Sequence, residues 1–307
     1  MSNFFMKRLA HSIFSLIGLL ILVFFLARLT GDPTDLYLPL NASEEARIAF
    51  SKKYGFSDPL LIQFKNFIIN IFRGDFGTSL LKQRPALEVV IESISITLWL
   101  AAITMIIAII VSLVVGSIAA CNPGGGFDRT ASIISLTGAS APDFWIAITA
   151  IFLFSVGLGW LPTSGVGDFS IKYWIMPVGV LLIRPIGQLV QVVRGSMLTA
   201  LSSPYVKTAR AKGVQEFFVV FKHALRNALI PVITVAADRA AGIANGAVIV
   251  EVIFGWPGVG KLLIDSIQQR DFAVIQGAVL VTALVIFAIN FIVDCAYAFL
   301  DPRIRNN

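Results

Sequence analysis

A run of 25 residues without a single charge, residues 96–120, constrains this chain more than any other feature. A helix needs about 20 apolar residues to cross the hydrocarbon core of a bilayer. Only 14% of the 307 residues are charged, whereas soluble domains carry about 25%. The sequence therefore predicts an integral membrane protein that is built from α-helices.

Five further apolar stretches are long enough to cross a membrane. The first lacks a small-x-small cleavage site at Ala27-Arg28-Leu29 and is too long for a signal peptide, so we expect a retained anchor. Pro142-Asp143 interrupts the third of the six spans. The fold class that follows is an all-α membrane protein with six transmembrane helices, at residues 9–29, 96–120, 131–156, 173–193, 228–253 and 277–300.

Lysines and arginines gather on one side of these spans. Cation-rich loops and termini face the cytoplasm, so both termini are predicted to be cytoplasmic. This bias also explains the net charge of +6 without nucleic acid. The short outside loops hold only Lys172, and Lys261 with Arg270. The inner side holds Lys7, Arg8, Arg129, the cations of residues 194–226, Arg303 and Arg305.

Residues 30–95 form an extracytoplasmic segment in this topology. Ser43, Ala46 and the run to Tyr54 predict a short amphipathic helix. Residues 59–72 have apolar residues at helical spacing but are too few to span a membrane, so a helix at the membrane surface or against the bundle is expected. Pro85 can open the helix that leads into the second span.

The segment 202–231 is a basic stretch between two spans. Its small residues alternate with cations, and an aromatic cluster follows, which favours a short helix that docks on a partner over a slack connector. The cations are Lys207, Arg210, Lys212, Lys222 and Arg226, the one acid is Glu216, the small residues are Ala209, Ala211 and Gly213, and the aromatics are Phe217, Phe218 and Phe221.

Four charged residues, Asp143, Arg184, Asp238 and Arg239, are predicted inside the membrane. A charge there costs about 2.5–3.5 kcal/mol on insertion scales. They could line a polar translocation path, or they could form structural ion pairs, for example Asp238 with Arg184. Pro142, Pro185 and Pro231 can kink helices, either to line a path or for packing alone.

The chain shows no chemical engine of its own. Residues 255–261 fit G-x4-G-K, but Leu262 follows where a phosphate-binding loop needs Ser or Thr. No hydrolase motif and no Cys/His metal spacing occurs, so we expect no catalytic residue, no metal and no cofactor in this chain. Cys121 and Cys295, at predicted cytoplasmic helix ends, are expected to be reduced thiols.

Matching stretches along the whole chain identify a family. The chain resembles the inner-membrane permease subunits of binding-protein-dependent ABC importers of the dipeptide/oligopeptide/nickel group, and its layout is similar to the first permease of the pair. The matching stretches are Gly31-Asp32-Pro33, YGFSDPLLIQF (54–64), GDFGTSL (74–80), GWLPTSG (159–165), YVKTARAKG (205–213), HALRNALIP (223–231), EVIFGWPGVGKLLIDSIQQRD (251–271) and LDPRIR (300–305).

The resemblance implies an N-terminal helix plus periplasmic segment at 1–94 and a type I ABC transmembrane domain at 95–304. It also implies that the loop 202–231 holds a coupling helix that sits on an ATPase subunit. Lys207, Thr208 and Ala209 stand where the superfamily has E-A-A, so the glutamate is absent. The expected coupling residues are Lys207, Thr208, Ala209, Arg210, Ala211, Lys212, Gly213 and Phe217.

The function predicted is a permease subunit that moves di- or oligopeptides, or similar small solutes, across a bacterial inner membrane. Nickel, glutathione or opine-like solutes remain alternatives, and a secondary transporter is a more distant one. The resemblance implies as partners a second, related permease, two ABC ATPases that bind ATP and Mg²⁺, and a periplasmic substrate-binding protein, in contact with membrane lipid and without nucleic acid.

Overall fold

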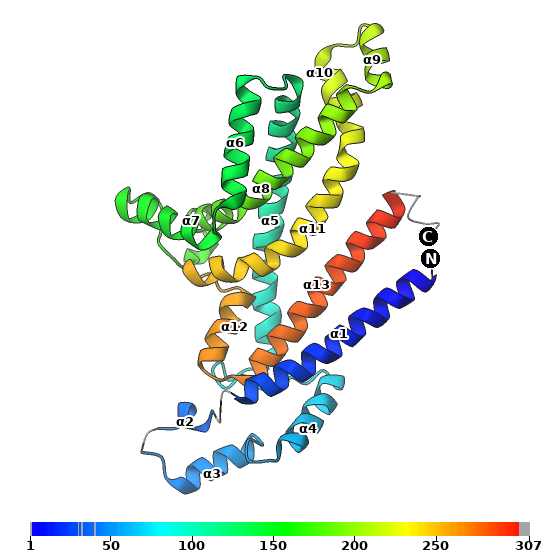
Figure 1. Ribbon diagram of the computed structural model, residues 1–307. Coiled ribbons are helices and arrows are strands. Elements are labelled where there is room, and N and C mark those ends of the chain that lie inside the picture. The colour runs from blue at the N-terminus through cyan, green and yellow to red at the C-terminus, as the bar shows by residue number, and fades with distance from the viewer. Residues whose placement is uncertain (1, 30, 32, 40, 301–307) are drawn as a thin grey trace. The chain divides into compact units, whose positions relative to one another are not determined.

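The computed structural model describes residues 2–29, 31, 33–39 and 41–300, and the regular structure of these residues is helical (Figure 1). The chain divides into two compact units. Unit 1 combines Met1–Thr97 with Pro257–Ala288, and unit 2 combines Leu98–Trp256 with Ile289–Asn307. Helices α5 (Ala86–Cys121) and α13 (Phe272–Leu300) contribute to both. The all-helical membrane fold that the sequence predicts is confirmed.

Helical segments occur at all six predicted spans. Four of them are long and apolar enough to cross a membrane. The segment at the third predicted span consists of two bent parts, and it brings the number to five if these parts form one span. In α1 (Ser2–Leu29), the described apolar part Ile13–Leu29 is shorter. The four long candidates are Ala86–Cys121, Ile171–Leu201, Glu216–Ala240 and Phe272–Ile292.

The third predicted span is two helices rather than one. α6 (Gly126–Ser140) ends, and α7 (Asp143–Ala150) continues as the π-helix η1 (Ile151–Gly157), with a bend of 102° between the two parts. Proline disfavours the helical conformation of the residue before it. Ala141 is accordingly extended, at φ −74° and ψ 136°. The interruption predicted at Pro142 is therefore a sharp corner.

The helices of unit 2 approach one another closely where glycines allow it. α8 (Ile171–Leu201) continues through Pro177 and Pro185, and α11 (Leu225–Ile253) continues through Pro231. A Cβ on Gly187 of α8 would lie 2.3 Å from the carbonyl oxygen of Ser135 in α6. Small residues permit such backbone contact between membrane helices, and this contact fixes α6 against α8.

The fifth predicted span starts earlier than expected. Between α8 and α11 lie α9 (Pro204–Ala211), α10 (Glu216–Phe218) and the π-helix η3 (Val219–Ala224), and the last two run directly into α11. Val219 and Val220 are buried, because this apolar stretch packs on the bundle. The segment predicted as a loop over 202–231 is thus outside the long helices only from about 202 to 215.

Unit 1 contains the short helices predicted for the N-terminal segment. α2 (Thr34–Tyr37) is followed by α3 (Glu44–Lys53), the short helix predicted up to Tyr54. Ser43 is its N-cap, because the Ser43 hydroxyl accepts a hydrogen bond from the Ala46 amide at 3.2 Å. α4 (Leu60–Phe72) coincides with the predicted surface helix. Farther along, Ser79 donates to Asp271 at 2.6 Å, and both side chains are buried.

The G-x4-G-K residues 255–261 run from the turn after α11 into the first turn of α12 (Val259–Gln268). A helix precedes them where a phosphate-binding loop would need a buried strand. Within unit 2, Trp256 of this stretch is fully buried and meets Trp174 edge to face, with ring centroids 4.7 Å apart. The stretch therefore has a packing role at Trp256.

Candidate functional site

The sequence of α9 favours a helix at its first turn. Pro204 stands at its first position, where a missing N–H costs nothing. Its C-terminal end follows from Gly213, whose φ of +77° suits glycine and strains other residues. A Cβ at Gly213 would meet nothing within 4 Å, so the requirement concerns the backbone and not space. The sequence-predicted short helix in this segment is confirmed.

One face of α9 is anchored on the bundle. Val206 and Ala209, three residues apart and therefore on one side of the helix, are buried. They join a cluster that includes Val193 and Met197 of α8 and Val219 of η3. Ala209 was expected to contact a partner protein, but its side chain packs inward instead, because position 209 falls on the buried face.

The opposite face of α9 is open. We define the α9 surface as the exposed residues of this helix and of the turn that follows it. Its chemistry is cationic, with two small residues that would let another backbone approach. The residues are Pro204, Tyr205, Lys207, Thr208, Arg210, Ala211, Lys212 and Gly213. At one end of unit 2, Figure 1 shows α9 on the same side as the turn between α5 and α6.

Arg210 is already paired within the chain. Its guanidinium donates to both carboxylate oxygens of Glu216, at 3.1 and 2.5 Å. This hydrogen bond is the main reason why the pKa of Arg210 is raised above its ordinary value. The pair joins α9 to α10, and both side chains are about half exposed, at 44% and 58%. Lys207 and Lys212 are the exposed lysines of the α9 surface.

Aromatic side chains extend the α9 surface toward α10. Phe217 is 65% exposed and Phe218 is 48% exposed. Phe217 also packs on Phe221, with centroids 5.0 Å apart, and Phe221 is partly buried against the cluster under α9. The aromatic group therefore has an anchored inner ring and two outer rings that are available to a partner.

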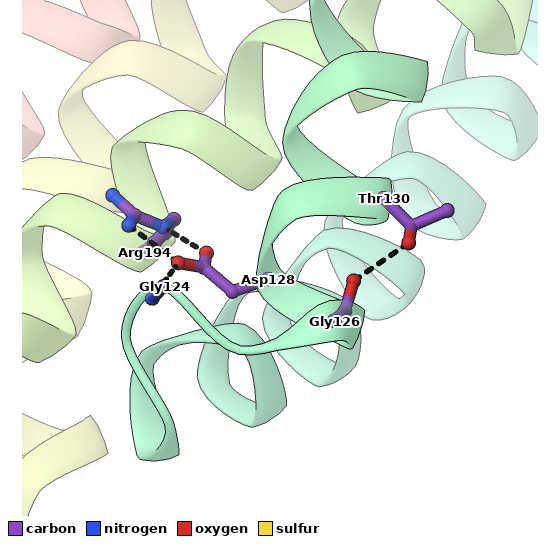
Figure 2. Close-up of polar contacts among 5 residues, drawn as sticks. All are labelled: Gly124, Gly126, Asp128, Thr130 and Arg194. Atoms are coloured by element: carbon purple, nitrogen blue, oxygen red, sulfur yellow. Dashed lines mark hydrogen bonds and ion pairs between the residues drawn. The ribbon is translucent and has the colours of Figure 1, made fainter.

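A second arginine–carboxylate pair joins the start of α6 to α8, and the sequence reasoning missed it. Arg194 of α8 donates to Asp128 through two nitrogens, and the amide of Gly124 donates to the same carboxylate at 2.7 Å (Figure 2). Thr130 donates to the Gly126 carbonyl at 2.6 Å in the same turn. The sequence did contain a signal for this pair, because Asp128 is the one acid of residues 121–130.

The Asp128–Arg194 pair fixes the segment that leads into α9. Asp128 is 3% exposed, and its carboxylate has three donors. Arg194 lies in the last third of α8, which ends at Leu201, just before α9 begins at Pro204. The turn between α5 and α6 is thereby tied to the helix that carries α9.

The four intramembrane charges form two pairs. Arg184 lies 3.7 Å from Asp143, and Arg239 lies 3.8 Å from its neighbour Asp238. The pairing of Asp238 with Arg184, considered from the sequence, is wrong. The corner at Pro142 explains this, since it presents the first turn of α7 to α8. Asp143 is largely covered, at 16%, whereas the other three side chains are 44% exposed or more.

Cys121 is exposed and has no disulfide, and the side chain of Cys295 lies outside the described residues. Among the side chains that the structure describes, no three His, Cys, Asp or Glu residues gather as a metal site.

Sequence comparisons give matches over the full length. The family model described as "Binding-protein-dependent transport system inner membrane component" matches residues 112–306. The oligopeptide transport system permease protein AppB of Bacillus subtilis (strain 168) is 37% identical over 315 residues, covering 99% of this chain and all of the relative. The glutathione transport system permease protein GsiC of Escherichia coli (strain K12) is 39% identical over 306 residues, covering 99% of each.

A solved structure has the same fold. The crystal structure of an amino acid ABC transporter with histidines aligns with a TM-score of 0.55 at 14% identity, over 69% of this chain and 94% of that one. At this identity the match concerns the fold alone.

Proposed function

The chain belongs to the family of binding-protein-dependent transport system inner membrane components, and we propose that it carries peptides across the membrane together with a second, related permease. The peptide substrate is supported by the oligopeptide and glutathione permeases that match it end to end. Glutathione is itself a small peptide, so one polar path could serve both kinds of solute. Glutathione is therefore the second candidate substrate.

The observation that carries the proposal is the α9 surface. A helix of eight residues is held on the bundle by Val206 and Ala209, while its other face offers lysines, small residues and the outer ring of Phe217. Interface energy concentrates in a few aromatic and charged residues. We assign Lys207, Thr208, Ala211, Lys212, Gly213 and Phe217 to the contact with an ATPase subunit. Arg210 and Ala209 act in the proposal by shaping α9.

ATP and Mg²⁺ belong in this proposal to two separate ATPase subunits. The permease pair receives solute from a periplasmic binding protein. The closing of the ATPases moves α9 as a rigid body with α8 and α11, and this switches the path between its two sides. The buried cluster under α9 supports a rigid-body movement of α9 with α8 and α11, because a closely packed core transmits a displacement with little internal deformation.

The translocation path is proposed to run along Arg184, Asp238 and Arg239. Each lies near the middle of a long helix, and each side chain is at least 44% exposed in the isolated chain. Because a charge facing lipid at that depth is costly, these side chains fit a water-filled path or a second permease. Asp143 acts there by holding Arg184 at the bend.

The positive-inside bias supports a cytoplasmic position for α9 and both termini. This orientation can be tested in a variant in which Cys121 and Cys295 are replaced by serine. A cysteine introduced at Thr208 should react with a membrane-impermeant maleimide only after the cells are opened. One introduced at Asn66 should react in intact spheroplasts. The opposite pattern would reverse the topology.

The transport role is tested by charge reversal on the α9 surface. In cells that lack the native permease, Lys207→Glu should lower the uptake of a labelled dipeptide by more than tenfold and reduce co-purification of the ATPases. Lys65→Glu on α4, an exposed cation of unit 1, is the matched control and should leave both unchanged. Full uptake and full co-purification with Lys207→Glu would contradict the assignment.

The substrate class is tested in the same cells. Labelled dipeptides, longer peptides, glutathione and nickel are offered separately, and the proposal expects uptake of at least one peptide that is lost on deletion of the permease. Uptake of nickel alone would overturn the peptide assignment but leave the family unaffected.

A further inference from the structure

Unit 1 contains a cavity of about 310 Å³ beside the end of α1, with both polar and apolar residues in its lining. It is bounded by α1, α3, α4, the segment 75–80 and the start of α13, all of which belong to this unit. A volume near 300 Å³ is at the small end of ligand sites. The charged and amide residues that matter below are Arg28, Lys53, Asp58, Asp75 and Gln276.

Arg28 is held rigidly at the wall of this cavity. Its Nε donates to Gln63 Oε1 at 2.6 Å, and the Gln63 amide in turn donates to the carbonyls of Phe56 and Asp58. The guanidinium carbon lies 4.2 Å from the ring centroid of Phe272. Aromatic faces favour a cation at this distance, so the guanidinium has a fixed position.

Two hydrogen-bond donors at this wall are unused. Arg28 Nη1 and Gln276 Nε2 are both buried, and neither has a partner among the described residues. Gln276 is only 7% exposed. Buried donors are nearly always paired, and a guanidinium and an amide nitrogen can only donate. The group that completes them is therefore a strong acceptor, and the charge of Arg28 favours an anion.

The cavity also contains carboxylates. Asp58 and Asp75 line it together with Lys53, so two negative charges balance the positive charges of Arg28 and Lys53. A bare anion would meet repulsion from the two carboxylates. A ligand that joins an anion to an amine finds a complementary group for each of its charges.

The surroundings of the cavity are apolar and exposed. α4 lines it with Gln63, Asn66 and Asn70, yet the same helix exposes Leu61 at 76% and Phe72 at 87%. A helix with one polar and one apolar face lies in the membrane interface. Arg28 stands in the last turn of the apolar helix α1, which is also where a span meets the head groups.

We propose that this cavity binds the head group of a phospholipid that carries a phosphate and a primary amine. Arg28 Nη1 and Gln276 Nε2 donate to phosphate oxygens, and the amine lies toward Asp58 and Asp75. The acyl chains follow the exposed apolar face of α4. The proposal rests on the proposed function only in that α1 must end at a membrane surface, and its test requires no transport.

The test uses the full chain, purified with its partners and delipidated. Binding of phosphatidylethanolamine is measured by native mass spectrometry and by the rise in melting temperature. Gln276→Leu and Arg28→Met should each weaken it by about tenfold or more, since each removes a hydrogen bond to a charged group. Lys65→Gln, an exposed cation of α4 that does not line the cavity, is the control and should bind as the unaltered chain does.

Gln276→Leu also guards against a simple folding defect. Replacement of an unpaired buried amide by an apolar group of similar size should keep or raise the melting temperature without lipid. A variant that is stable but no longer gains stability from lipid therefore supports the proposal. Equal binding by Gln276→Leu, Arg28→Met and the unaltered chain would overturn it.

Further ligands, of which three are soluble, distinguish a lipid head group from a free anion or a peptide. Glycerophosphoethanolamine should bind weakly at the same residues, and phosphatidylcholine, which lacks a primary amine, should bind less well than phosphatidylethanolamine. If inorganic phosphate binds as well as the lipid, or if a dipeptide binds with the same dependence on Arg28 and the lipid does not, the lipid assignment is wrong. Loss of uptake in Lys207→Glu tests the transport role independently of all these outcomes.

Discussion

Two arginine–carboxylate pairs lie at the same end of unit 2 and differ mainly in burial. Arg194 donates hydrogen bonds to Asp128 from two nitrogens, and Arg210 donates to Glu216 in the same bidentate way. Asp128 is nearly inaccessible, with its side chain 4% exposed, whereas Glu216 is 58% exposed. Exposed ion pairs contribute about 0–1 kcal/mol, but breaking a buried pair costs about 3–5 kcal/mol.

The difference indicates two tasks. The inner pair, Asp128–Arg194, ties the turn between α5 and α6 to α8 and must stay intact for the bundle to hold its shape. The outer pair, Arg210–Glu216, joins α9 to α10 at the surface, where water competes for both groups and the geometry can adjust. The same chemistry thus gives a fixed joint in one place and an adjustable joint in the other.

The largest expected effect comes from breaking the inner pair. Asp128→Ala leaves the charge of Arg194 without its partner and should lower the free energy of unfolding by about 3 kcal/mol. Unfolding of the detergent-solubilised chain in a denaturant series measures this. The double variant Asp128→Leu with Arg194→Met is the control, because an apolar pair of similar size should recover most of the loss. A loss below about 1 kcal/mol in Asp128→Ala would place this pair in the same class as the outer one.

The next effect concerns the turn that brings Arg210 to Glu216. Gly213→Ala forces a side chain into a left-handed conformation, which costs about 1–2 kcal/mol, although the new Cβ meets nothing within 4 Å. Gly195→Ala in α8 also adds a Cβ in open space, but without a positive φ. It should stabilise the helix by about 0.5–1 kcal/mol. If Gly213→Ala lowers the melting temperature and Gly195→Ala raises it, the opposite changes show that backbone strain alone acts at Gly213.

A smaller change follows from breaking the outer pair. Glu216→Gln should alter the free energy of unfolding by less than about 1 kcal/mol, because both groups are well solvated. Its effect on dipeptide uptake per molecule of inserted permease should exceed its effect on stability, since α9 would lose its link to α10. Uptake that falls only in proportion to the amount of folded protein would remove the outer pair from the coupling role.

Salt gives the smallest and finest comparison. Raising the ionic strength from about 0.1 M to about 1 M shortens the Debye length from about 10 Å to about 3 Å. The contribution of Glu216, measured as the stability difference between Glu216 and Glu216→Gln chains, should vanish at high salt. The corresponding difference for Asp128→Ala should change little, because buried pairs are screened much less. An equal salt dependence of both would contradict the burial argument.

Local patterns in the sequence predicted a large part of the fold. Ser43 predicted the start of α3, and the spacing of apolar residues predicted α4, because caps and periodicity act within a single helix. The effect of Pro142 was also anticipated, although the sequence could not show that the two helices meet at 102°. That angle depends on how α7 packs on its neighbours.

The candidate site was predicted in outline only. The sequence located a short helix in the stretch 202–231 and named the residues of its surface, yet it did not show that Ala209 faces inward or that Arg210 is held by Glu216. Helical periodicity alone leaves open which face is buried when both faces carry small residues. The start of the next helix at Glu216 was missed because cations among the aromatic residues resembled a loop.

The sequence by itself determined that this chain is an α-helical membrane protein, because spans of about 20 apolar residues and a biased distribution of cations arise from the bilayer and need no tertiary contacts. Only the tertiary structure decided which charges meet, Arg184 with Asp143 and Arg194 with Asp128, and that Arg28 and Gln276 line one cavity. Such pairs join residues from helices far apart in the chain. Their energies depend on burial, which a linear pattern does not contain.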